Sequence, residues 1–77
     1  MTPTQLRQAL KELNGERHAI FAFAGMSDSV HHEGPTLKVE HAMLIPDEPD
    51  HLVKVTDGKS VFIIDAERVA WIRIGLK

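Results

Sequence analysis

Residues 52–74 hold the pattern that most constrains the fold: three short apolar runs separated by breaks of only a few residues. The first break contains Asp57-Gly58, a pair typical of tight hairpin turns because both residues tolerate a positive backbone φ. No connection in this stretch has room for a crossover helix, so neighbouring strands must run antiparallel. The sequence therefore predicts an antiparallel meander of three strands. These strands are expected over residues 52–56, 60–64 and 69–74.

A helix is predicted at the start of the chain, over residues 3–14. Thr2 and Gln5 have the spacing of a capping box, and Pro3 suits the first helical position because that position leaves its N–H unused. Leucines then recur at helical spacing, and the Asn-Gly pair that follows them is a typical stop. The helix is amphipathic, so we expect its apolar face to lie on the rest of the protein.

Two further strands are expected over residues 18–24 and 36–45. The first is apolar on alternate positions of both faces, which predicts that both faces are covered. Residues 25–35 between them lack periodicity and are long for a hairpin connection, so this segment is a candidate functional loop. The whole chain is predicted to be a single domain, mainly β with one N-terminal helix. Its five short antiparallel strands should form a small, strongly bent sheet or a partly open barrel.

The apolar runs at residues 60–64 and 69–74 carry more apolar side chains than the outer wall of a small sheet requires. A chain of 77 residues buries roughly 60% of its unfolded surface, and this one has no cysteine to add a disulfide. We expect these strands either to lie under the helix or to be buried between copies of the chain. A homo-oligomer is therefore predicted.

The charge distribution argues against strong nucleic-acid binding. The net charge is −2, and residues 26–58 contain seven acids against two bases. Such a surface repels phosphates, which normally supply much of the affinity for nucleic acid. Arg7, Lys11 and Arg17 form either a local basic face or, as we favour, a solvated helix surface. No apolar run approaches the roughly 20 residues that span a bilayer, and no signal peptide is evident, so a cytoplasmic protein without membrane contact is expected.

The order of one helix and five strands resembles the Sm-like fold of ring-forming RNA-binding proteins, a small barrel of SH3-like type. In that family one strand ends in Ile-Arg-Gly, and Val or Ile opens the last strand after two polar residues. Residues 64–69 have this spacing. The family's other signature begins with Asp and ends with Asn-Leu. Asp47 and Leu52 match its ends, while His51 stands where Asn is expected.

The resemblance implies a ring in which the last strand pairs with a neighbour's preceding strand. It also implies a nucleobase pocket, but Asp65, Ala66 and His51 replace the Arg, Gly and Asn that build it in the family. An acid in place of that cation is expected to weaken RNA binding. The candidate binding residues are Asp47, His51, Asp65 and Arg68.

The histidines suggest a second reading, a metal site. His31 and His32 are adjacent in the irregular segment, and Asp28 and Glu33 nearby could add oxygen ligands, although a plain polar loop is favoured. His41 is expected on an apolar strand face, partly buried. His51 is expected to hydrogen-bond to Asp47 or Asp50. Those two acids lie on a turn flanked by prolines and should be solvated, with ordinary pKa values.

Aromatic stacking and catalysis are weaker hypotheses. Trp71 with Phe62 could form a stacking platform for bases, but core packing is favoured. No nucleophile has an evident base and third group to orient it, so an enzyme is not expected, nor is a cofactor. The sequence thus favours a non-catalytic interaction module that self-associates through its C-terminal strands and binds a protein partner or, weakly, RNA. The alternative is a small-molecule- or metal-responsive domain that uses residues 25–35.

Overall fold

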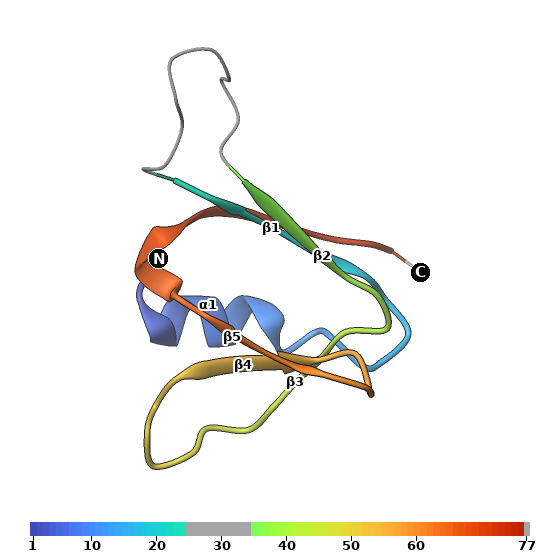
Figure 1. Cartoon of the computed structure of the whole chain (residues 1–77), viewed down its shortest axis with the longest axis horizontal. Helices are drawn as coiled ribbons and strands as arrows, with labels where there is room; N and C mark the ends of the chain where they lie inside the picture. The colour runs from blue at the N-terminus through green and yellow to red at the C-terminus, as the bar shows by residue number, and fades with distance from the viewer. Residues whose placement is uncertain (25–34, 77) are drawn as a thin grey trace.

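A computed structural model describes residues 1–24 and 35–76. They form two three-stranded antiparallel sheets with strand orders β2-β1-β6 and β3-β4-β5, and one short helix (Figure 1). The elements are α1 (Pro3–Leu10), β1 (Ala19–Phe23), β2 (Thr36–Val39), β3 (Met43–Leu44), β4 (Val53–Thr56), β5 (Val61–Ile64), the 3-10 helix η1 (Ala66–Arg68) and β6 (Val69–Ile74). This confirms a mainly β protein with one N-terminal helix. The expectation of five strands is wrong, since the described residues form six, and the two sheets do not close into a barrel.

The predicted strand over residues 36–45 is broken in the middle, which accounts for the sixth strand. His41 has a φ of 50° and an exposed side chain, so the prediction of a partly buried histidine on a strand face is wrong. The next residue, Ala42, is buried, and its N–H donates to the Arg17 carbonyl at 2.8 Å while its own carbonyl accepts from Gly15 N at 3.0 Å. These bonds lead the chain out of one sheet and into the other.

The β4–β5 hairpin forms as predicted. Asp57 Oδ1 accepts from the backbone N–H groups of Lys59 and Ser60, both at 2.8 Å, and Gly58 has a φ of 90°. A side chain that bonds its own turn in this way replaces the missing ladder bonds at the hairpin tip. The same two bonds hold the pKa of Asp57 below its usual value.

The predicted three-stranded meander is wrong, because β6 pairs with β1 and not with β5. The polar break between them folds as η1, and Asp65 caps it by accepting from Glu67 N at 3.2 Å. This 3-10 turn redirects the chain to the other sheet. Among the described residues, β5 and β6 therefore each pair with a strand on one side only (Figure 1).

Helix α1 begins as predicted but stops at Leu10 instead of residue 14. Its capping box is present: Gln5 N donates to Thr2 Oγ1 at 3.1 Å, and Thr2 N donates to Gln5 Oε1 at 3.0 Å. Leu6 and Leu10 are fully buried where the helix contacts β3, β4 and η1. The Met1 nitrogen, donating to the Ala66 and Val69 carbonyls, ties the start of the chain to η1.

Burial differs between the strands that were expected to be covered on both faces. In β1, Phe21 and Ala22 are both buried, which confirms the prediction for that strand. In β5, Val61 and Ile63 are 56% and 60% exposed, so one face of this strand is open to solvent.

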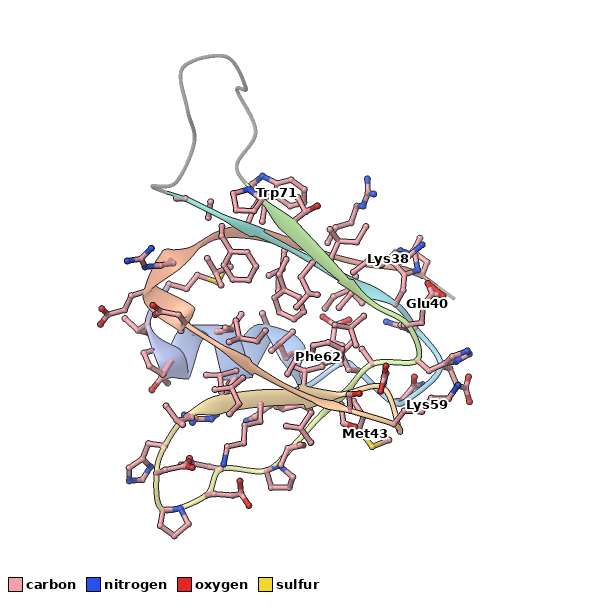
Figure 2. The ribbon with its side chains drawn as sticks, in the orientation of Figure 1. Lys38, Glu40, Met43, Lys59, Phe62 and Trp71 are labelled. Carbon is pink, nitrogen blue, oxygen red and sulfur yellow. The ribbon has the colours of Figure 1, made fainter. Side chains whose placement is uncertain are left out.

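The two aromatic residues considered for a stacking platform do not form one. Phe62 is partly buried against the core, as favoured, but Trp71 is exposed. They belong to different sheets and lie well apart (Figure 2).

Candidate functional site

A pocket of about 360 Å³ brings two of the candidate binding residues together. His51 and Asp65 both line it, although they are 14 positions apart and belong to different connections. Its walls come from the start of α1, the entry to β4, the end of β5 and the start of η1. The lining residues are Pro3, residues 51–53, residues 63–64 and residues 65–67.

His51 holds the lip of the pocket through an unusual backbone conformation. Its φ is 58°, a left-handed value that histidine adopts more readily than most residues. His51 N donates to the Glu48 carbonyl at 2.8 Å, and Leu52 N donates to Asp50 Oδ1 at 3.1 Å, which closes a tight turn. His51 Nδ1 lies 3.3 Å from both carboxylate oxygens of Asp47, so the predicted contact with Asp47 is confirmed.

Arg7 fixes this turn from behind. Its Nη2 donates to the carbonyl oxygens of His51 at 2.6 Å and Leu52 at 3.1 Å, and lies 3.1 Å from Asp47 Oδ1. The side chain is only 16% exposed, so placing Arg7 on a solvated helix surface or a basic face is wrong. The sequence did hold a sign of this position, because Arg7 lies three residues before Leu10, at the border of the apolar face of the helix.

Lys54 binds the other side of the same acidic loop. Its Nζ pairs with Glu48 and, at 2.7 Å, with Asp50 Oδ2, and most of its side chain is buried. The Lys54 hydrogen bond, followed by the one from Leu52 N, holds the pKa of Asp50 below its usual value, while Asp50 and Glu48 raise the pKa of Lys54. Asp50 therefore does not have the ordinary pKa expected for it.

These shifts predict that stability falls at both pH extremes. The pKa values of Asp50 and Asp57 are lower in the folded protein, so their contributions are complete above their unfolded value of 3.8 and are lost as pH falls through the folded values. The pKa of Lys54 is raised, so its contribution is complete below 10.5 and is lost as pH rises through the folded value. The urea midpoint should therefore be flat between these limits.

Asp50→Asn and Lys54→Met test the origin of the two limbs. When urea midpoints are measured across pH, Asp50→Asn should reduce the acid limb and leave the part due to Asp57, while Lys54→Met should remove the alkaline limb and also reduce the acid limb, because Lys54 is the main partner of Asp50. An acid limb unchanged in Asp50→Asn would contradict the assignment to this loop.

Asp65 and Arg68, the remaining candidates, meet at the opposite lip. Asp65 Oδ2 lies 3.5 Å from Arg68 Nε, in addition to its capping bond to Glu67 N. Arg68 does not line the pocket, whereas Asp65 and Glu67 do. Among the described residues that line it, none is Lys or Arg, so this lip is negative.

The other predicted site residues do not bear on the pocket. His31 and His32, with Asp28 and Glu33, lie outside the described residues. Within residues 1–24 and 35–76, no group of three or more His, Cys, Asp or Glu side chains could hold a metal ion. Over the same residues, no helix has the length and apolar character needed to cross a membrane.

Comparison with known proteins finds no match, whether to a family model, a curated protein or a solved structure.

Proposed function

We propose that this protein is a non-catalytic interaction module that self-associates by pairing the open edge of β5 with the open edge of β6 in another copy. The observation that carries the proposal is the β5 edge. Val61 and Ile63 expose more than half of their surface there, on a strand that ends its sheet. An open, apolar edge is a ready template for another strand.

The backbone of β5 is free to pair. The Lys54 carbonyl accepts from Ile45 N at 2.9 Å, so the backbone polar groups of Lys54 face β3. Lys54 lies opposite Ile63 on the neighbouring strand. The two form a non-hydrogen-bonded antiparallel pair, in which the backbone N–H and C=O groups of each residue point away from the other strand. The N–H and C=O of Ile63, and of Val61 two positions earlier, therefore point out of the sheet edge.

The same reasoning applies to β6. Gly75 N donates to the His18 carbonyl at 2.9 Å, so Gly75 faces β1 and its neighbour Ile74 faces away. By alternation, Ile72 also presents its N–H and C=O outward. On both edges, the backbone N–H and C=O groups of every second residue thus point outward. Because they lie on different strands, pairing them joins copies head to tail, which closes into a ring if the rotation allows.

The order of paired strands supports an Sm-like relationship within this proposal. Two of the four edge strands among the described residues are β6 and β5, the last strand and the one before it; the other two are β2 and β3. The last strand and the one before it are the strands that the ring-forming family pairs between copies. RNA binding is left out of the proposal, because the acids Asp65 and Glu67 on the pocket would repel a phosphate chain.

Solution mass tests the proposal. The wild-type protein is expected to show a discrete mass several times that of the 8.6 kDa chain by light scattering after size exclusion. A double variant, Val61→Lys with Ile63→Lys, should give the single-chain mass, because it places two charges in the interface. Ile63→Pro should also weaken assembly, since it removes only an outward-facing N–H.

The matched control is Met43→Lys, which changes an exposed apolar residue on β3 in the same sheet (Figure 2). It should assemble like the wild type. A wild-type protein that stays a single chain at every concentration would overturn the proposal, as would an unchanged mass in the double lysine variant.

A further inference from the structure

We propose that the pocket is a binding site for a small organic cation, an ammonium or guanidinium group carried on an apolar body. The inference rests on the cavity, its apolar walls and the charge of its lip. Ile63 lines the cavity and also belongs to the β5 edge proposed for self-association, so this proposal applies to the single chain and is tested separately from assembly. Nothing in the interaction-module function requires such a site.

The size and walls of the pocket fit a small molecule. Its volume of about 360 Å³ lies within the range of small-molecule sites, roughly 300–1,000 Å³. Leu52 and Ile63 line the pocket and remain 47% and 60% exposed, while Ala66, which also lines it, is buried. Apolar side chains left open around a concavity gain from covering by an apolar ligand.

The charges at the pocket select a cation. Asp65 and Glu67 supply the ionised side chains of the lining, with His51 as the third titratable group. Glu67 has no ion pair within the described residues, and Asp65 has only the exposed contact with Arg68 at 3.5 Å. A ligand ammonium in the pocket would be attracted by both carboxylates, whereas a carboxylate or phosphate ligand would be repelled.

Apart from Arg68, which contacts Asp65 at 3.5 Å, the cations near the pocket bind other groups. Arg7 is turned to the His51 and Leu52 carbonyls and to Asp47, behind the lip. The Met1 nitrogen donates to the Ala66 and Val69 carbonyls and is not part of the lining. The acids of the lip therefore keep negative charge for a ligand.

The frame of the pocket is held before any ligand arrives. Arg7 fixes one lip through two backbone carbonyls, and the capping bond of Asp65 fixes the other. A preformed site loses less conformational entropy when a ligand binds. This lower cost favours binding even of a ligand small enough to fit the pocket.

The test is a titration of the full chain with hexylamine and with hexanoate, a pair of similar shape and opposite charge. Backbone amide shifts in NMR spectra are the readout. Hexylamine is expected to move the amides of Leu52, Ile63 and Ala66 in a saturable manner, and hexanoate is not. Neutralising both acids, Asp65→Asn with Glu67→Gln, should raise the dissociation constant of hexylamine roughly tenfold or more.

Two controls isolate the site. Glu16→Gln removes an exposed acid that does not line the pocket and should titrate like the wild type. Val61 does not line the pocket, so Val61→Lys tests assembly while leaving the hexylamine shifts in place. Equal binding of hexanoate, or an unchanged dissociation constant in the doubly neutralised variant, would overturn the proposal. Loss of assembly in Val61→Lys would not affect it.

Discussion

Replacing Phe21 by alanine should lower the free energy of unfolding by about 3–5 kcal/mol, the usual range for a buried phenylalanine. Phe21 is the largest fully buried side chain and sits on the central strand β1, opposite Leu37 on β2 and Ile72 on β6. Truncation loses its transfer free energy and leaves a cavity between the two sheets. At roughly 0.05–0.15 kcal/mol per residue, a 77-residue domain has about 4–12 kcal/mol of stability, so this loss is a large part of the total.

Urea or thermal unfolding followed by circular dichroism measures the effect. The matched control is Leu76→Ala, a truncation of an 88% exposed residue outside β5, β6 and the pocket lining, which should stay within about 0.5 kcal/mol of the wild type. A Phe21→Ala variant that loses no more than this control would mean that the space between the sheets is not the core.

The features that follow local rules were predictable from the sequence. The capping box of Thr2 and Gln5 and the hairpin at Gly58 each depend on residues within a few positions of one another. The bounds of β6 are those predicted, since its apolar run begins directly after a polar break. Sequence signals of this kind predict the structure correctly because the hydrogen bonds they describe form within one segment.

The features that depend on distant partners were not predictable from the pattern. His41 breaks an unbroken alternation of side chains by adopting a positive φ, and no glycine or proline marks the position. The pairing of β6 with β1 is decided by η1, whose four-residue break looks like an ordinary turn. Alternation tells which face a residue takes, but not which strand lies beside it.

The candidate site divides in the same way. His51 and Asp65 were singled out by their places in a family pattern, and the pocket does bring them together. Arg7 was missed because its partners are backbone carbonyls 44 and 45 positions away, and a carbonyl has no identity in the sequence. The charge of Arg7 suggested a surface role, whereas its Nη2 contacts two backbone carbonyls and the Asp47 carboxylate.

Replacing Arg7 by methionine should therefore destabilise the protein by about 2–3 kcal/mol, because charge-assisted hydrogen bonds to the His51 and Leu52 carbonyls are lost together. Methionine keeps much of the apolar stem, so the loss isolates the guanidinium. Arg7→Lys should recover only part of it, since the lysine Nζ ends one bond short of the position of Nη2, the nitrogen that makes all three contacts of Arg7. Amide hydrogen exchange at His51 and Leu52 should accelerate in both variants, which ties the loss to this loop.

Arg17→Met is the matched control for this change. Arg17 pairs with Glu12 at 3.6 Å, and its side chain is about twice as exposed as that of Arg7. Exposed pairs of this kind contribute about 0–1 kcal/mol, so the control should lose far less stability. If Arg7→Met and Arg17→Met unfold at the same urea concentration, Arg7 does not clamp the loop. If Arg7→Met unfolds at a lower urea concentration and also weakens hexylamine binding, Arg7 shapes the lip of the pocket although it does not line it.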